Sequence, residues 1–422
     1  MARLHEYQAK QLLREAKIPV PRGAVASSPE EASRIAADIG GPVVVKAQVW
    51  ATARSKAGGI RFAINAEEAG QIAAALLGAH IKGLLVEQVL VEEKLDIAKE
   101  FYAGVIVDDS HLVKAPVLIL STAGGVDIEQ VARESPEHIA RMSVDVRRGV
   151  RPYHAGELAL AIGLSGEALA SACQVLVSLY GVFRRNDARS VEINPLVLTT
   201  AGKWYAADCR VSIDDASVSR HPELGIAFAR ESDRPPTELE KIAWRIEQDD
   251  YRGVSFFAQL TPEVRESGYI GYHAIGGGGA LLAADALGRH GLKLADYAET
   301  SGNPPASKVY RIAKIILSQP GIQGYCLMGA VMSSQDLWHH AHGLVKAFRE
   351  ELAGRPGFPV VILLCGNKEE ESLRILHEGL HHLPICLELY GREHIHRLDA
   401  VAARMRALVD GYQTAGKAGG RV

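Results

Sequence analysis

The chain has 422 residues, of which 47% are hydrophobic and 23% are charged, and its formal net charge is −3. This balance is typical of a globular protein with two or three domains, and the slight negative charge argues against a nucleic-acid partner. No apolar run approaches the roughly 20 residues that a membrane span needs, and the first residues enter a helical pattern without a signal-peptide core. We therefore expect a cytoplasmic protein with no membrane partner.

Short strands and helices alternate in the first half of the chain. The pattern predicts a helix over residues 5–16, strands over residues 42–47 and around 60–64, and a helix over residues 66–77. A polar, proline-bearing stretch over residues 214–236 is typical of a domain boundary.

After this boundary the sequence repeats one design three times. Apolar strands are predicted at residues 269–275, 323–328 and 360–364, and each is followed by a glycine-bearing turn and a helix. Such units predict a parallel, doubly wound sheet. We therefore expect an α/β protein with two domains, residues 1–235 and 240–422.

The segment around Glu192 carries the clearest functional signal. Glu192 and Asn194 lie two residues apart in an apolar strand, so their side chains point to one face, and Asp208 on the next strand can lie beside Asn194 across a hairpin. Oxygen ligands on adjacent strands suit a hard divalent cation that carries nucleotide phosphates. A polar patch on an exposed sheet face is the alternative.

A strand that ends in Lys46 and the basic loop 50–59 that follows it resemble a phosphate grip, because a lysine charge and backbone amides both bind phosphate oxygens. A basic surface loop is the simpler alternative. Glu92 and Glu100 bracket a charged segment, and they could accept hydrogen bonds from ribose hydroxyls or belong to a solvated charge run. Residues 121–129 predict either a loop over the site or a hairpin.

Carboxylate-binding positions are predicted at three strand ends of the second domain, where helices begin after residues 276–279, 300–305 and 329–335. Free N–H groups and the helix dipole favour anions there. The serines at these positions could equally be helix caps. The histidines at 339, 340, 342, 381 and 382 lie in polar helical patterns and are expected on solvated helix faces.

Six ordered motifs resemble the β subunit of succinyl-CoA synthetase: LHEYQAKQL (residues 4–12), VKAQV (45–49), KAGG (56–59), DIAKE (96–100), GGVDIE (124–129) and EINPLV (192–197). The resemblance covers essentially the whole chain and implies an ATP-grasp domain followed by a flavodoxin-like ligase domain. It also implies that Asn194 and Asp208 hold magnesium and that Glu192 steadies a phosphohistidine of a partner subunit. The implied nucleotide contacts are Lys46, Ala53, Arg54, Ser55, Glu92, Leu95 and Glu100.

The chain departs from the family pattern in two places. The phosphate loop reads TARSK at residues 52–56, where the family usually has GGRGK, so its basic residues are kept and its glycines are not. In the second domain Ile275 replaces an asparagine, and residues 297–304 look more like the citrate-binding part of ATP-citrate lyase. That likeness places the substrate acid at Ser301, Gly302, Ser333 and Gln335, with Lys368 as the nearest substitute for an arginine that citrate-type enzymes carry.

The resemblance implies a β-type subunit of an NDP-forming carboxylic acid–CoA ligase of the tricarboxylic acid cycle type. Such a subunit uses Mg²⁺ and ATP or GTP to phosphorylate a histidine of a partner α-type subunit, which binds most of the CoA, and thereby activates a small di- or tricarboxylic acid. Two alternatives stay open. One is a stand-alone ATP-grasp carboxylate–amine ligase, and the other is a catalytically weakened nucleotide-sensing subunit.

Overall fold

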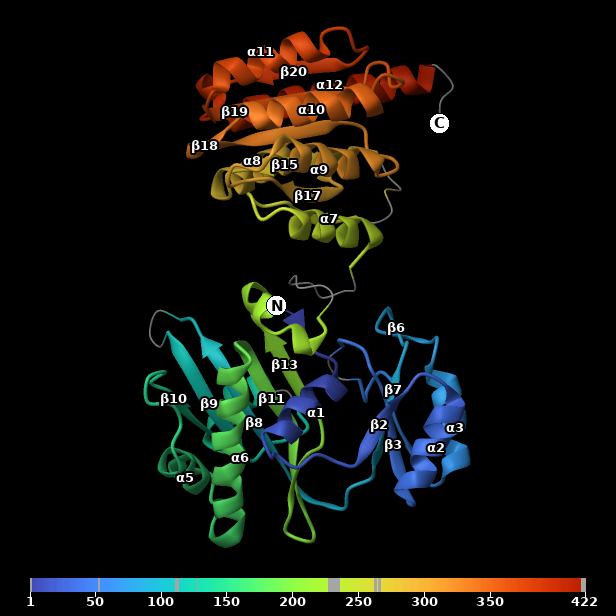
Figure 1. Cartoon of the computed structure of the whole chain (residues 1–422), viewed down its shortest axis with the longest axis vertical. Coiled ribbons are helices and arrows are strands. Elements are labelled where there is room, and N and C mark those ends of the chain that lie inside the picture. Colours follow the sequence, from blue (N-terminus) through green and yellow to red (C-terminus); the bar gives the residue numbers. More distant parts are fainter. Residues whose placement is uncertain are drawn as a thin grey trace. The chain divides into compact units, whose positions relative to one another are not determined.

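The computed structural model describes residues 2–51, 54–110, 114–126, 128–226, 236–261, 264 and 267–418; the side chains of residues 332–334 and 416–418 lie outside this description. The chain divides into two compact units, Met1–Pro235 and Pro236–Val422 (Figure 1). Each unit has its own sheets and its own hydrophobic core.

A mixed-length antiparallel sheet forms the larger half of the first unit. Its order is β1 (Ala2–Arg3), β13 (Cys209–Ile213), β11 (Ala188–Thr199), β8 (Ile97–Asp108), β9 (Ala115–Ser121) and β10 (Ile139–Ser143), with β12 (Trp204–Ala206) paired to β11. Helices α5 (Pro152–Ala161) and α6 (Gly166–Arg185) pack beside this sheet. α6 is long and apolar enough to cross a membrane by length and composition alone. Its buried residues recur every three or four positions and face β8 and β11, as in a core helix: Ala172, Val175, Leu176, Leu179, Val182 and Phe183.

A second antiparallel sheet has the order β2 (Gly23–Ala26), β7 (Val89–Glu93), β3 (Val43–Ala47) and β4 (Ile60–Ala63). Helices α2 (Pro29–Ile39) and α3 (Ala66–Leu76) bury their apolar faces against it. Helix α1 (Glu6–Glu15) packs against β13 of the other sheet. Smaller elements complete the unit: β5 (His80–Ile81), β6 (Leu84–Leu85), α4 (Ile128–Glu134) and the 3-10 turns η1 (Pro136–His138), η2 (Asp215–Arg220) and η3 (Pro222–Leu224).

The second unit is the doubly wound sheet that the sequence predicts. Its order is β14 (Phe256–Gln259), β17 (Asp296–Glu299), β15 (Tyr269–Ile275), β18 (Tyr325–Asp336), β19 (Pro359–Asn367) and β20 (Cys386–Tyr390), with β16 (Lys293–Leu294) beside β15. Only β14 runs antiparallel to its neighbour among the described pairs. Parallel pairing brings the carboxyl ends of the central strands to one edge, where their connecting loops meet.

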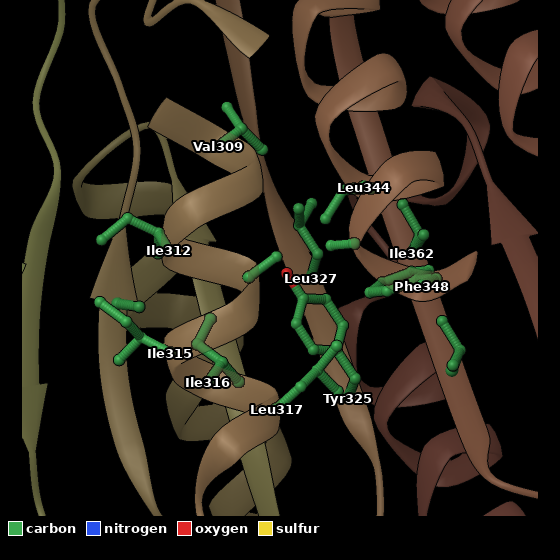
Figure 2. Packing of buried hydrophobic residues seen from close by; sticks show 14 of the residues in the cluster. Val309, Ile312, Ile315, Ile316, Leu317, Tyr325, Leu327, Leu344, Phe348 and Ile362 are labelled. Atoms are coloured by element: carbon green, nitrogen blue, oxygen red, sulfur yellow. The ribbon is translucent and has the colours of Figure 1, made fainter. Parts of the chain in front are cut away.

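Alternate residues of the central strands face two different helical layers. Tyr272 and Met328 pack against α8 (Gly278–Arg289) and α12 (Leu398–Ala418). Tyr325 and Leu327 face α9 (Ala306–Ser318) and α10 (Trp338–Glu351), together with α7 (Glu238–Asp249) and α11 (Glu369–Leu380). Figure 2 shows this second layer, where side chains of α9 and α10 meet Tyr325 and Leu327. Burial on both faces explains the continuous apolar runs of these strands.

Candidate functional site

Two lysines and two glutamates form a buried cluster in the first unit. Lys46 lies near the end of β3, and its Nζ is 2.8 Å from Glu6 and 2.8 Å from Glu92. Lys10 on α1 has the same partners, since its Nζ is 2.8 Å from Glu6 and 2.6 Å from Glu92. Both ammonium groups also donate to the carbonyl oxygen of Ala207, at 2.6 and 2.8 Å. The cluster therefore ties α1, β3 and β7 to the strand end that precedes Asp208.

Burial and charge act in opposite directions on these groups. Burial by itself favours the neutral form of Glu6, but Lys10, Lys46 and Arg54 hold its pKa well below the usual range. Burial likewise opposes the charge of Lys46, yet Glu6 and Glu92 raise its pKa above the ordinary value. The opposite charges of Glu6 and Lys46 therefore offset the cost of burying each of them.

Arg54 extends the cluster toward Asp208. Its Nη2 lies 2.5 Å from Glu6 Oε2 and 2.8 Å from Asp208 Oδ2, and its Nη1 donates to the carbonyl oxygen of Ala47 at 2.9 Å. The side chain of Arg54 is buried, whereas that of Asp208 is 28% exposed. Ser55, predicted to touch nucleotide, is exposed in the same loop, and Ala53 lies outside the described residues.

Asn194 lies beside Asp208, as the hairpin predicts, and its N–H donates to the carbonyl oxygen of Asp208 at 3.0 Å. Its carboxamide binds the turn that follows β9, because Oδ1 accepts from Gly125 N at 2.7 Å and Nδ2 donates to Val126 O at 2.9 Å. This turn approaches β8 so closely that a side chain at Gly124 would meet the backbone of Phe101. The described part of the segment after residue 121 is therefore a turn held against Asn194, in the connection between the antiparallel strands β9 and β10.

Glu192 lies on the same strand and accepts a hydrogen bond from the Tyr102 hydroxyl at 3.2 Å. Arg210 is its cross-strand neighbour on β13. The burial pattern of β11 alternates here, with Val191 and Ile193 fully buried and Glu192 partly exposed. Glu192 is thus a carboxylate at the accessible face of the sheet, separate from the ion cluster of Glu6 and Glu92.

The side-chain oxygen atoms of Asn194 and Asp208 fit a magnesium ion in type. Both are hard donors on adjacent strands, and Mg²⁺ commonly takes one or two protein oxygens and completes its shell with phosphates and water. Among the described residues, no group of three or more histidines, cysteines or acids could hold a metal by itself. Asn194 and Asp208 are the residues that would hold the ion.

The remaining nucleotide-contact predictions fall in different surroundings. Glu92 is only 2% exposed, and its carboxylate is engaged by two lysines, so it supports Lys46 more directly than it faces an open site. Glu100 is exposed on β8, and its carboxylate lies beside Gly125. Leu95 is partly buried in the connection from β7 to β8.

Glu6 and Lys10 were not predicted as site residues from the sequence. Their spacing of four residues on α1 resembles an ordinary surface ion pair of a helix. The available signal was that both fall on the face that carries Ala9 and Leu13, which is the buried face. Their burial in the same cluster as Lys46 follows only from the packing of α1 against the sheet.

In the second unit, the first two acid-binding candidates lie at the end of β17. The Ser301 hydroxyl donates to Glu299 Oε1 at 2.8 Å and accepts from Gly276 N at 3.0 Å. Glu299 also accepts from Gly277 N at 3.2 Å, so an internal carboxylate already engages the start of α8. Gly302 is exposed with φ +71°, a turn conformation that favours glycine.

The other two candidates lie at the end of β18. Gln335 is fully buried, and its carboxamide is bonded to His340 and to the backbone of Asn303. Ser333 belongs to β18, but its side chain lies outside the described part of the chain.

An arginine reaches the carboxyl end of β19 although none is close in sequence. Arg392, after β20, donates from Nη2 to Gly366 O at 3.1 Å and from Nε to Glu369 Oε2 at 3.1 Å. Its side chain is 64% exposed. Lys368, the substitute suggested by the sequence, is at the start of α11 with φ +58°. The structure therefore places a guanidinium where sequence spacing predicts no arginine.

Comparison with known proteins finds one family model in each of the two compact units. The family model described as ATP-grasp domain matches residues 3–198, and the one described as ATP citrate lyase citrate-binding matches residues 249–405. The GDP-forming succinate–CoA ligase β subunit of Thermus thermophilus is 40% identical over 375 residues, which are 88% of this chain and 93% of that protein. The ADP-forming β subunit of Methanothermobacter thermautotrophicus is 35% identical, with 89% and 94% of the two chains covered.

The fold is also found in a solved structure. ATP citrate lyase from Methanothrix soehngenii, determined with citrate and coenzyme A, has a TM-score of 0.77 to this chain, with 96% of this chain and 99% of that chain covered at 19% identity. The family model and the named relatives together define an acid–thiol ligase subunit with an ATP-grasp domain. The identities show that the chain belongs to the succinate–CoA ligase β subunit family.

This membership confirms the predicted α/β fold with an ATP-grasp domain and the predicted class, a β-type subunit of an NDP-forming acid–CoA ligase. It also implies the use of a nucleotide and Mg²⁺, and an α-subunit partner in general.

Proposed function

We propose that this chain uses Mg²⁺ and ATP or GTP to phosphorylate a histidine on a separate CoA-binding α-type subunit. The γ-phosphoryl group passes to the imidazole nitrogen, and the nucleoside diphosphate leaves. The phosphoryl group then passes to a carboxylate oxygen of the acid, and the CoA thiol attacks the acyl carbon of the resulting acyl phosphate, releasing inorganic phosphate. A cytoplasmic location and the absence of nucleic-acid and membrane partners remain predictions.

The observation that carries this proposal is a linked set of groups. Lys46 and Arg54 share the carboxylate of Glu6, Arg54 binds Asp208, and the backbone of Asp208 is bonded to that of Asn194. Lys46 and Arg54 supply positive charge for phosphate oxygens, and Asp208 and Asn194 would hold Mg²⁺, which neutralises phosphate charge when bound. Glu92 and Glu6 keep the cations ionised and in place. Glu192 would orient the partner's imidazole and stabilise positive charge on it during transfer.

The acid site is proposed at the carboxyl ends of β17 and β18, around Ser301, Gly302, Ser333 and Gln335. Arg392 would supply a charged contact for a second or third carboxylate, because a guanidinium binds planar carboxylates in a fixed geometry. We infer a di- or tricarboxylate as the substrate. The likeness of residues 249–405 to a citrate-binding family model and of the whole chain to succinate–CoA ligases supports that class.

One observation favours a second candidate, a subunit that senses nucleotide with weakened catalysis. Glu6, Glu92 and Asp208 already pair with the described cations of the phosphate grip, so a nucleotide has to compete with internal carboxylates for Arg54 and Lys46. Weak magnesium-nucleotide binding with no phosphorylation of the α-type subunit would favour this candidate.

The test is to co-purify the chain with the α-type subunit encoded nearest to it and to measure CoA- and nucleotide-dependent turnover of succinate, malate, citrate and related acids. Turnover of one acid identifies the substrate and supports the proposal. A stable complex that phosphorylates no histidine with either nucleotide would overturn it. Activity of the chain without a partner would instead favour a stand-alone ATP-grasp ligase.

A further inference from the structure

A chain of fully buried polar side chains lies beneath the candidate acid loops of the second unit. It contains His273 on β15, Thr300 after β17, His340 on α10, and Tyr325 and Gln335 on β18, each with 0% exposed surface. The sequence predicts a solvated face for the histidines around 340, and this is wrong for His340, although His342 is exposed. Burying polar groups is unfavourable unless they are hydrogen-bonded, so the burial of these side chains depends on the hydrogen bonds among them.

The hydrogen bonds form one unbroken chain that links β18, α10, the turn after β17 and β15. Gln335 Nε2 lies 3.2 Å from His340 Nδ1, and His340 Nε2 lies 2.7 Å from Thr300 Oγ1 and 3.1 Å from the Thr300 carbonyl oxygen. Thr300 Oγ1 lies 2.7 Å from His273 Nε2. His273 Nδ1 in turn contacts the Tyr325 hydroxyl.

The donors and acceptors can be assigned from one end. The backbone N–H of Asn303 is 3.3 Å from Gln335 Oε1 and can only donate, so Oε1 accepts and the amide Nε2 must donate to His340 Nδ1. His340 then carries its proton on Nε2 and donates to Thr300. The Thr300 hydroxyl is left to donate to His273 Nε2, and His273 donates through Nδ1 to Tyr325.

This assignment requires both imidazoles to be neutral, with one donor and one acceptor nitrogen each. Burial lowers the pKa of His340 to about 4 and lowers that of His273 well below its usual value. Both rings are therefore neutral at physiological pH, and each of their ring nitrogens has a partner of the opposite kind.

The Gln335 end of the hydrogen-bond chain is connected to the candidate acid loops. Asn303 Oδ1 accepts from Asp336 N at 3.1 Å, so Asn303 and the end of β18 are joined twice, once through each backbone. Ser301 and Gly302 lie between Thr300 and Asn303, and Ser333 lies two residues before Gln335. Every acid-site candidate thus belongs to the buried hydrogen-bond chain or lies within two residues of one of its members.

We propose that His340 and His273 are positioning residues that, through Thr300 and Gln335, fix the 300–303 turn against the end of β18 and so set the geometry that receives the carboxylic acid. The part that concerns the acid rests on the proposed function. The fixing of one loop against the other does not, and the two can be tested separately.

Hydrogen exchange of the full chain, followed by mass spectrometry, tests the loops without any assay of activity. His340→Phe keeps an aromatic ring and removes the hydrogen bonds of the side chain to Gln335 and Thr300, and we expect at least tenfold faster exchange at residues 300–303, which belong to a different element. His340→Gln keeps a donor and an acceptor and should restore much of the protection. His342→Phe, an exposed position on the same helix, is the matched control and should change neither loop.

The complex with the α-type subunit tests the acid. His340→Phe should raise the KM for the acid about tenfold, with kcat and the KM for nucleotide within twofold of the unmodified enzyme. Unchanged exchange at 300–303, or faster exchange spread evenly over the second unit, would overturn the positioning role, as would an unchanged KM in an active enzyme. If the unmodified complex turns over no acid, the proposed function fails, while the exchange result still decides whether the loops are joined.

Discussion

Arg54 Nη2 donates to both carboxylate oxygens of Asp208, at 3.0 and 2.8 Å. The residue proposed to hold Mg²⁺ is therefore paired with a residue proposed to hold phosphate. A cation that binds Asp208 weakens this ion pair, and a phosphate that binds Arg54 frees the carboxylate for metal. Magnesium and nucleotide should consequently bind together more tightly than either binds alone.

The metal assignment predicts that Asn194→Ala and Asp208→Ala each abolish magnesium-dependent phosphorylation of the α-type subunit. The physical reason is the loss of one of two protein oxygens that would hold the ion. Phosphorylation is measured with γ-labelled nucleotide, and the melting temperature checks that the variants are folded. Asp109→Ala, at an exposed turn, is the control; full phosphorylation in either site variant contradicts the assignment.

Glu192→Gln should leave nucleotide affinity unchanged while slowing phosphorylation of the partner at least tenfold. Glu192 lies outside the ion cluster and bonds to Tyr102, so it has no direct part in holding phosphate. Nucleotide binding by calorimetry and single-turnover phosphorylation separate the two effects, with Tyr102→Phe as a control that removes the hydroxyl and keeps the carboxylate. If Glu192→Gln weakens nucleotide binding as much as Lys46→Ala does, the role at the histidine is wrong.

Glu6→Gln should destabilise the protein by about 3–5 kcal/mol, because it removes a buried carboxylate that three cations share. The folded-state pKa of Glu6 is depressed, so its stabilising contribution is present above the unfolded value of 4.5 and is lost as the pH falls below it. Urea unfolding at pH 7 and at pH 4 should therefore show a smaller difference between variant and parent at the lower pH. Glu15→Gln, on the exposed side of the same helix, should have little effect at either pH.

Asp296→Asn should stabilise the second unit at neutral and alkaline pH. Burial raises the pKa of Asp296 to about 8, and one of its carboxylate oxygens has no hydrogen-bond partner. The unfolded chain loses this proton from about pH 4, whereas the folded chain keeps it up to about pH 8. The free energy of unfolding therefore falls progressively as the pH rises from 4 to 8. We expect a gain on the order of 2–4 kcal/mol at pH 8 and almost none at pH 4, from urea unfolding. An equal gain at both pH values would mean that ionisation is not the cause.

Arg392→Ala should raise the KM for the acid at least tenfold and leave the KM for nucleotide unchanged. The guanidinium is an exposed cation at the end of β19, and loss of a charged contact to a carboxylate is costly. Arg392→Lys should restore only part of the affinity, because an ammonium cannot reproduce the planar contact. Arg374→Ala, an exposed arginine of α11, is the control. If the KM for the acid is unchanged, Arg392 does not bind the acid and serves only as the partner of Glu369.

Local pattern alone determined the elements and one part of the site. The period of the apolar residues gave the central strands of the second unit to within a few residues at their starts, because a buried parallel strand is a continuous apolar run. The alternation around β11 placed Glu192 and Asn194 on one face, and the short hairpin brought Asp208 beside Asn194. Each of these relations spans fewer than about twenty residues, where backbone geometry leaves little choice.

Only the tertiary structure decided the contacts between distant segments. Glu6 and Lys10 resemble a surface pair until α1 packs against β13 and brings them to Lys46 and Glu92. Arg392 has no sequence link to the end of β19 until β20 is added to the sheet. His340 was expected on a solvated helix face and Gln335 at the substrate acid, yet both side chains are fully buried, where their hydrogen bonds replace those to water. Burial and pairing of polar groups depend on which elements meet, and sequence periodicity does not specify that.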